Sequence, residues 1–325
     1  MTFTAAVVQA GSVVMDRDGC IEKAERLIRE SGKQGAQLIL LPEGFVPAYP
    51  WGLTFGAPVG DRTAEGRRLF ERYFNNAVEI PSPEVDRLCQ AAKDASAFVG
   101  MPIIEREGSL GRGTLYCTLL YIGADGTLLG KHRKLKPTAA ERVIWGEGDG
   151  STLCSFKTEL GTIGGLICWE NMMPMARMAM YGKGVEIYLA PTADERDSWQ
   201  ATLRHIANEG RCFVLGCNQY LTKSMYPADL PCIGDLADMP EVVSSGGSAI
   251  VSPFGEYLAG PLFNEEGILT AELDMAEIAR GRFDFDVTGH YSRPDVFRLI
   301  VDESEKKSVV SGSLAPVKPS SVPLE

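Results

Sequence analysis

Short apolar runs, bounded by glycine, proline or polar residues, alternate along this chain with stretches whose apolar residues recur at helical spacing. Residues 36–41 and 185–190 are such runs, whereas the apolar residues within 21–28 keep the spacing of a helix face. Runs this short predict buried strands, and their alternation with helices predicts an α/β fold. Two further runs are joined by Ala124-Asp-Gly-Thr127, a strong hairpin signal. We therefore expect a mixed sheet system with antiparallel as well as parallel neighbours.

The same patterns place the other elements. Strands are predicted at residues 2–10, 36–41, 97–104, 115–122, 128–133, 161–167, 185–190, 212–219, 247–253 and 268–273. Helices are predicted from Asp16 or Asp18 to Gly32 and at 83–95, 174–181 and 199–209, the last with Ser198 as its N-cap. Residues 220–245 show no clear period and are predicted to form a long surface loop. We expect one catalytic domain over residues 1–303 and a flexible tail over 304–325, where aromatic residues are absent.

The composition is that of an ordinary soluble globular protein, with 45% hydrophobic and 23% charged residues. A net charge of −11 argues against a nucleic-acid partner, because phosphate binding relies on clustered lysine and arginine. No apolar stretch approaches the ~20 residues that span a bilayer, and no secretory leader is visible, so we expect no membrane partner. The eight cysteines form no Cys-x-x-Cys pair, which favours a cytoplasmic protein and gives no support for a metal. No cofactor is expected either, because Gly146-Glu-Gly-Asp-Gly150 lacks dinucleotide-binding spacing.

Three residues capable of chemistry each follow a predicted strand. Glu43 comes after the strand at 36–41, Lys134 directly after 128–133, and Cys168 directly after 161–167. The ends of strands in one sheet system can converge, and α/β folds place reacting groups there. Taken singly, each residue has a simpler interpretation. Glu43 could be a surface carboxylate and Lys134 one of several solvent-exposed cations in its segment. Cys168 could be a buried cysteine that acts as a small apolar side chain.

The sequence around these residues is more specific than their placement. Leu41-Pro-Glu43-Gly-Phe-Val-Pro-Ala-Tyr-Pro50, His132-Arg-Lys134-Leu-Lys-Pro-Thr138, Glu141-Arg-Val-Ile-Trp-Gly-Glu-Gly-Asp-Gly-Ser151 and Cys168-Trp-Glu-Asn171 resemble the nitrilase superfamily, and the nitrilase branch within it. Segments 191–194, 204–213 and 289–297 match further blocks, so the resemblance covers nearly the whole chain. It implies a four-layer α-β-β-α sandwich in a single domain. It also implies a homo-oligomer, in which subunits pair through one face as dimers and can assemble further into spiral filaments.

The resemblance implies a role for each residue at its position. Cys168 is the nucleophile, Glu43 the general base and Lys134 the cation of a Glu-Lys-Cys triad, with Glu141 as an additional acidic residue beside it. The implied reaction converts a small nitrile and water to a carboxylic acid and ammonia, through a thioimidate and then a thioester on the cysteine. A nitrile carbon is a modest electrophile and requires the strong nucleophile that a thiolate supplies. Lys134 and the backbone N–H of Trp169 are expected to stabilise the negative charge that develops on the nitrogen.

Five aromatic residues are predicted to line the substrate pocket: Tyr49, Trp51, Trp145, Trp169 and Trp199. Tyr49 and Trp169 adjoin the catalytic segments, whereas Trp145 lies in a loop and Trp199 on a predicted helix, where a tryptophan is as often part of the core. No acidic or metal partner for His132 is visible in the sequence, so no chemistry is assigned to it.

The main alternative is an amidase, a carbamoylase or a cyanide-hydrolysing member of the same superfamily, with the same Glu, Lys and Cys set. Cys168-Trp-Glu-Asn171 and the block from Glu141 to Ser151 favour a nitrilase. A non-catalytic scaffold with this fold is a different alternative, which the intact Glu43 and Lys134 disfavour. A serine hydrolase is not expected, because no Gly-x-Ser-x-Gly elbow occurs. The preferred nitrile and the ratio of acid to amide product stay open.

Overall fold

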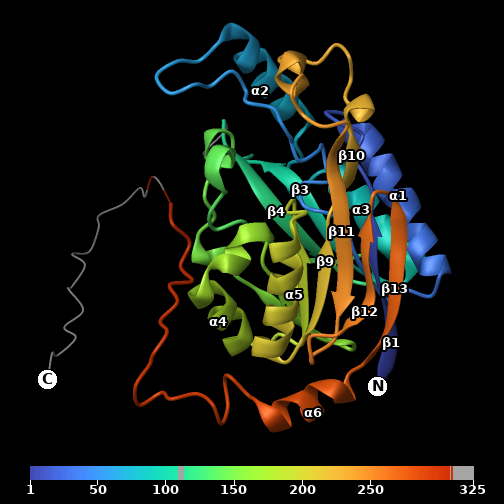
Figure 1. The fold of residues 1–325 in the computed structure, drawn as a ribbon, viewed down its shortest axis with the longest axis vertical. Coiled ribbons are helices and arrows are strands. Elements are labelled where there is room, and N and C mark those ends of the chain that lie inside the picture. Colours follow the sequence, from blue (N-terminus) through green and yellow to red (C-terminus); the bar gives the residue numbers. More distant parts are fainter. Residues whose placement is uncertain (109–112, 308, 310–325) are drawn as a thin grey trace, which may run out of the picture.

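The computed structural model describes residues 1–108, 113–307 and 309, and its described part contains two β-sheets that lie face to face (Figure 1). The first sheet has the strand order β13 (Gly267–Asp274), β1 (Thr2–Gln9), β2 (Leu38–Leu40), β3 (Phe98–Arg106), β4 (Leu115–Ile122), β5 (Leu128–Arg133). The second has the order β10 (Tyr220–Thr222), β11 (Val242–Val251), β9 (Phe213–Cys217), β8 (Ile187–Pro191), β7 (Gly161–Gly165), β6 (Ser155–Thr158), and β12 (Tyr257–Phe263) pairs with β11. In each sheet three central strands are parallel, β1–β2–β3 in the first and β7–β8–β9 in the second. The remaining pairs are antiparallel, which is the mixed system that the sequence predicted.

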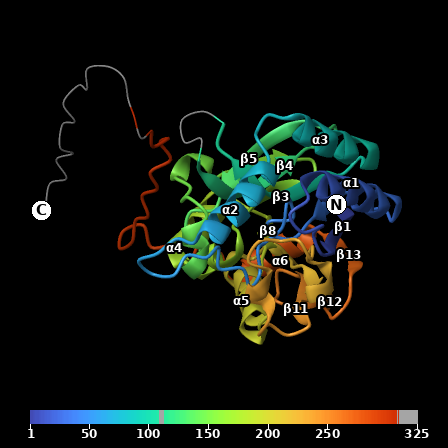
Figure 2. The ribbon, with the colours of Figure 1, turned by 90° about the horizontal axis from the view of Figure 1, so that it is seen from above.

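Helices cover the two outer faces of this pair of sheets (Figures 1 and 2). Helices α1 (Arg17–Lys33) and α3 (Pro83–Ala95) lie together on the first sheet, and α4 (Pro174–Gly182) and α5 (Asp197–Gly210) lie on the second. Helix α2 (Ala64–Asn76) lies at one end of the sandwich and α6 (Ala276–Asp284) at the other. The architecture is therefore the four-layer α-β-β-α sandwich.

The alternation of side chains along each strand builds three separate cores. In β1, Ala5 and Val7 face the second sheet, whereas Ala6 and Val8 face α1 and α3. In β8, Leu189 faces the first sheet and Ala190 faces α4 and α5. Because successive residues of a strand point to opposite faces, a strand buried on both sides reads as an unbroken apolar run. This is why the sequence shows these strands so clearly.

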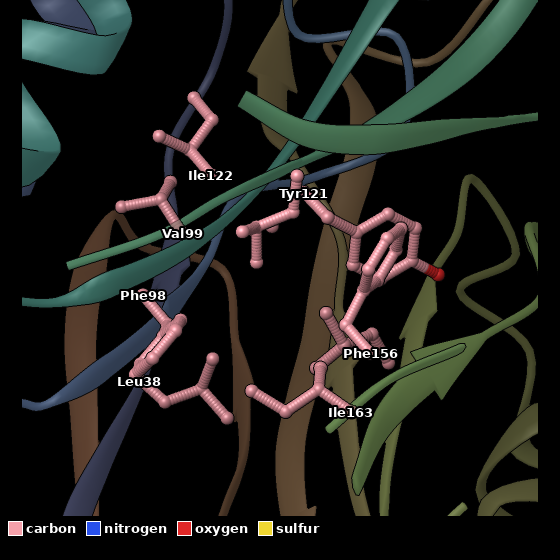
Figure 3. A pocket seen from close by; sticks show the side chains of 10 residues that line it. Leu38, Phe98, Val99, Tyr121, Ile122, Phe156 and Ile163 are labelled. Carbon is pink, nitrogen blue, oxygen red and sulfur yellow. The ribbon is translucent and has the colours of Figure 1, made fainter. Parts of the chain in front are cut away.

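A small apolar cavity of about 10 Å³ lies between the two sheets (Figure 3). The rings of Tyr121 and Phe156 pack against one another on one side of it, with their centroids 4.9 Å apart. Leu38, Phe98 and Ile163 line it from both sheets. Its lining is apolar and its volume is about that of one water molecule, so we expect it to stay dry.

The structure corrects several sequence-based expectations. Helix α5 begins at Asp197 after the N-cap Arg196, so Ser198 lies inside the helix. Residues 220–245 are not a continuous loop, because β10, two short 3₁₀-helices (η4, Lys223–Met225; η5, Ile233–Leu236) and the start of β11 occupy much of the segment. Besides β10, two helices and two strands were not predicted: α2, α6, β6 and β12. Most of the predicted tail at 304–325 falls outside the described residues.

The described part of the chain contains no helix with both the length and the apolar character needed to cross a bilayer.

Candidate active site

The ends of three strands from both sheets bring the predicted residues together. Glu43 lies in the turn after β2, and Lys134 directly follows β5. Cys168 begins the 3₁₀-helix η3 (Cys168–Met172) after β7, and Glu141 lies in the 3₁₀-helix η1 (Ala139–Val143). The turn at Glu43 continues through Gly44, whose φ of +59° is a conformation that glycine adopts without strain. The first sheet therefore carries the carboxylate and the lysine, and the second carries the thiol.

Lys134 lies between the two carboxylates. Its Nζ is 2.7 Å from Oε1 of Glu43 and 2.7 Å from Oε2 of Glu141, and the side chains of Lys134 and Glu43 are both 0% exposed. Glu141 also accepts hydrogen bonds from the Tyr49 hydroxyl at 2.7 Å and from the backbone N–H of Thr138 at 2.6 Å. Both oxygens of Glu141 are thus occupied. Oε2 of Glu43, by contrast, is buried and has no hydrogen-bond partner within the described residues.

The shared burial of these charges shifts their pKa values. Burial raises the pKa of Glu43 to about 7, although Lys134 lowers it and Glu141 raises it further. Burial and the negative charge of Glu43 raise the pKa of the Cys168 thiol, and Lys134 opposes them. Burial disfavours the Lys134 ammonium, but Glu43, Cys168 and Glu141 outweigh it and raise the pKa of that lysine. At neutral pH the lysine is therefore charged and the thiol is protonated beside a carboxylate that can exchange a proton.

Cys168 adopts a left-handed backbone conformation, with a φ of +52°. This region is unfavourable for a side chain with a Cβ and costs about 1–3 kcal/mol, so the surrounding structure must hold it. The Asn171 amide donates to the carbonyls of Cys168 at 2.9 Å and Leu166 at 3.0 Å, and the Tyr188 hydroxyl donates to the Asn171 side chain. The hydroxyl of Thr192, which follows β8, donates to the thiol at 3.2 Å. The turn thus directs the thiol toward the lysine and its carboxylates.

A cavity of about 310 Å³ opens above Cys168. Tyr49, Trp51, Glu141 and Trp169 line it. Three of the five aromatic residues predicted for the pocket therefore contribute to its wall. Trp169 is 37% exposed, and its indole N–H donates to Asp194 at 2.8 Å.

The other two predicted pocket residues do not line this cavity. Trp199 is 1% exposed and packs in the core between α4, α5 and the second sheet, because its position on α5 faces the sheet. Trp145 lies behind the cavity wall, where its ring centroid is 5.6 Å from that of Tyr49 and 5.7 Å from Nζ of Lys134. It packs against the tyrosine and the lysine without lining the cavity.

Sequence reasoning missed four residues of this site. Cys117 on β4 donates through its thiol to Oε1 of Glu43 at 3.6 Å, and Thr192 contacts Cys168. His132 does have an acidic partner, because its Nε2 lies 3.1 Å from both oxygens of Glu170. The alternation along β5 was a usable signal for His132, since it places His132 and Lys134 on the same face of the strand. Thr192 lies in the segment 191–194 that resembles a family block, but nothing in the sequence gave it a role, and no local pattern points to Cys117.

Comparison with known proteins agrees with this geometry. The profile of the carbon-nitrogen hydrolase family matches residues 4–283. An aliphatic nitrilase of Sinorhizobium fredii is 52% identical over 95% of this chain and 98% of its own length. A bifunctional nitrilase/nitrile hydratase of Lupinus angustifolius is 50% identical over 93% of this chain and 86% of its own length.

Solved structures give the same fold. A carbon-nitrogen hydrolase of Helicobacter pylori superposes with a TM-score of 0.71 at 20% identity, over 91% of this chain and 97% of that one. Saccharomyces cerevisiae Nit3, a member of branch 10 of the nitrilase superfamily, has a TM-score of 0.69 at 21% identity, over 89% and 96% of the two chains. The family match, the two close relatives and the fold lead to one conclusion: the chain belongs to the carbon-nitrogen hydrolase family, within its nitrilase branch.

Proposed function

We propose that this protein hydrolyses an organic nitrile to the carboxylic acid and ammonia, with Cys168 as the nucleophile. The observation that carries the proposal is a thiol on a strained turn, open to a cavity and beside a lysine that two buried carboxylates share. Relatives named as nitrilases, half of whose residues are identical to this chain, support the nitrile as the substrate.

Glu43 begins the reaction as the general base. It takes the proton of the Cys168 thiol, and its unpartnered Oε2 is the free acceptor for that proton. The sulfur then attacks the nitrile carbon, and the nitrogen gains the proton to give a thioimidate. The charged Lys134 and the backbone N–H of Trp169 stabilise the negative charge on that nitrogen, a contribution typically worth ~3–4 kcal/mol for one donor.

Water completes the reaction in two additions. The first water adds to the thioimidate carbon, and the tetrahedral species expels ammonia to leave a thioester. The second water releases the carboxylic acid and restores the thiol. Glu43 moves the protons in each addition, and Glu141 holds the Lys134 ammonium in place. Glu141 contacts both Lys134 and Tyr49, so its removal would loosen the catalytic cation and the pocket wall together.

Release of an amide is a second outcome of the same intermediate. If the tetrahedral species expels the thiol before ammonia, the product is the amide. The relative from Lupinus angustifolius is named as both a nitrilase and a nitrile hydratase, which favours partial amide release here.

The organic group of the substrate has a place in a second cavity of about 610 Å³. This cavity shares Tyr49, Trp51 and Glu141 with the cavity above Cys168, so the two adjoin. Leu53, Phe55 and Ile144 contribute apolar surface to it. We therefore infer that the substrate carries an apolar group larger than a methyl, which extends from the nitrile carbon into this second cavity.

The proposal is tested by ammonia release across a panel of nitriles of increasing chain length, with their matched amides. We expect turnover of nitriles, fastest for those with an extended apolar group, and none for Cys168→Ala despite an unchanged melting temperature. Turnover of the amides alone would show an amidase. Undiminished activity of Cys168→Ala would overturn the mechanism.

We also propose that the protein is a homo-oligomer in a reducing, cytoplasmic setting. All eight cysteines are free thiols, which supports a reducing compartment. The segment after α6 exposes Phe297 by 78% and Ile300 by 90%, and apolar side chains left so open support burial against another subunit.

A further inference from the structure

The Glu170 carboxylate lies between the two segments that carry the catalytic lysine and thiol. It is completely buried. Its Oε1 accepts the backbone N–H of Leu135 at 2.6 Å, and its Oε2 accepts the backbone N–H of Ile167 at 2.7 Å. Leu135 directly follows Lys134, and Ile167 directly precedes Cys168. One carboxylate therefore joins the end of β5 in the first sheet to the turn after β7 in the second.

His132 provides the positive charge that this buried carboxylate needs. Its Nε2 lies 3.1 Å from both oxygens of Glu170, and its Nδ1 lies 3.1 Å from the carbonyl oxygen of Thr152. A carbonyl oxygen can only accept, so the Nδ1 that faces Thr152 carries a proton. The Nε2 faces both oxygens of Glu170, and a proton on this nitrogen as well makes the ring an imidazolium paired with that side chain. Although burial opposes the charge, Glu170 raises the pKa of His132, in agreement with this assignment.

We propose that the Glu170–His132 ion pair is a positioning unit, which sets the separation of the Lys134 ammonium and the Cys168 thiol across the two sheets. Neither residue lines the cavity above Cys168. The pair acts through the main chain: Glu170 holds the residues next to Lys134 and Cys168, and His132 is on the same strand face as Lys134. It also helps to hold the left-handed turn at Cys168, because Ile167 is the residue before it.

Glu105 on β3 offers a matched control, because its ion-pair partners lie on β5, the strand of His132. It is a second buried carboxylate, and it forms ion pairs with Lys131 and Arg133. These two residues alternate with His132 and Lys134 along β5, so Glu105 holds the opposite face of the strand. A variant at Glu105 therefore disturbs a buried ion-pair network of side chains on β5, whereas a variant at Glu170 disturbs hydrogen bonds to the backbone beside Lys134 and Cys168.

The proposal rests on the proposed function in treating Cys168 as the nucleophile, but its test reads the thiol directly. Glu170→Gln, His132→Gln, the double variant and Glu105→Gln are compared with the native protein. The rate of alkylation of Cys168 by iodoacetamide is followed from pH 6 to pH 9 by peptide mass spectrometry. Melting temperature, kcat and KM are measured for each protein.

We expect Glu170→Gln and His132→Gln to lower kcat on the order of 10- to 100-fold with little change in KM, because a displacement of about 1 Å between reacting groups has an effect of that size. The alkylation profile of Cys168 should move to higher pH, since the lysine is no longer held near the sulfur. The double variant should be no slower than the slower single variant, because both changes disrupt one unit. Glu105→Gln should lower the melting temperature and leave kcat and alkylation within about twofold of native, within the scatter expected of a change that does not touch the site.

Unchanged Cys168 alkylation in both Glu170→Gln and His132→Gln would overturn the proposal. It would also be overturned if Glu105→Gln changed kcat and Cys168 alkylation as much as those two variants do. If no nitrile is turned over by the native protein, the proposed function fails while the alkylation profiles still decide this inference. Should Glu170→Gln not fold, His132→Gln provides the comparison, because it keeps an amide donor toward Glu170 while it removes the charge and the ring contact to Thr152.

Discussion

At the scale of single residues, the site depends on how a few buried charges are shared. Lys134 forms ion pairs with both Glu43 and Glu141, and the two carboxylates differ in their remaining hydrogen bonds. Glu141 is fully occupied by Tyr49 and Thr138, whereas Glu43 keeps one oxygen unpartnered. This difference separates a carboxylate that positions the lysine from one that can accept a proton. The sequence motifs pointed to all three residues, but the division of labour between the two glutamates follows only from their hydrogen bonds.

The raised pKa of Glu43 predicts the acid limb of the activity profile. Glu43 accepts a proton only when ionised, and burial raises its pKa to about 7. We expect kcat/KM to increase about tenfold per pH unit below that value and to level off above it, because kcat/KM reports the groups of the free enzyme. The same shift favours the protonated carboxylate in the folded state, so the stability it contributes is present at acidic pH and is lost as the pH rises through about 7. A profile that is flat between pH 5 and pH 8 would contradict the role of Glu43.

At the scale of secondary-structure elements, the sequence predicted the buried helices and strands and missed the exposed ones. Strands buried on both faces, such as β3 and β8, were found because their residues read as unbroken apolar runs. Strand β12 was missed because nearly all of its side chains are exposed or half-exposed, and α2 because few of its positions are buried. The turn at Cys168 lies beyond the reach of periodicity, because side-chain hydrogen bonds hold its left-handed backbone: the Asn171 amide donates to it and the Glu170 carboxylate accepts from it.

Helix α5 provides a prediction that separates core from pocket. Trp199 is enclosed between α5 and the second sheet, so Trp199→Ala should lower the free energy of unfolding by about 3–5 kcal/mol. Its kcat and KM, measured well below the melting temperature, should stay near the native values. Trp169→Phe is the contrasting variant, because it removes the hydrogen bond to Asp194 at the mouth of the cavity. It should change KM and leave the unfolding free energy within about 1 kcal/mol of native. A large rise in KM for Trp199→Ala would contradict this prediction and show that Trp199 contributes to substrate binding.

At the scale of the whole molecule, the site exists only because two sheets are packed face to face. The first sheet brings Glu43 and Lys134, and the second brings Cys168 and Thr192. A sequence pattern identifies strand ends, but it does not tell which ends from different sheets will meet. The family resemblance supplied that information for the triad. It did not supply the Glu170–His132 link, because His132 lies on β5 of the first sheet and Glu170 lies in η3, which follows β7 of the second.

If the protein assembles through the segment after α6, the mass of the particle in solution should depend on the apolar side chains of that segment. Replacing Phe297 and Ile300 by Asp should lower the particle mass in light scattering, because charged side chains oppose burial of that surface against another subunit. Exposed Glu305→Gln is a control outside this apolar pair and should leave the mass unchanged. A native protein that is monomeric at all concentrations would contradict the assembly.

The left-handed backbone at Cys168 has a consequence for how this protein can change over generations. Glycine is the residue that this conformation favours, so selection for folding alone would replace the cysteine. The thiol persists there only while its chemistry is under selection. A copy of this gene released from that selection would therefore be expected to lose the proposed nucleophile early and to become a more stable, inert protein.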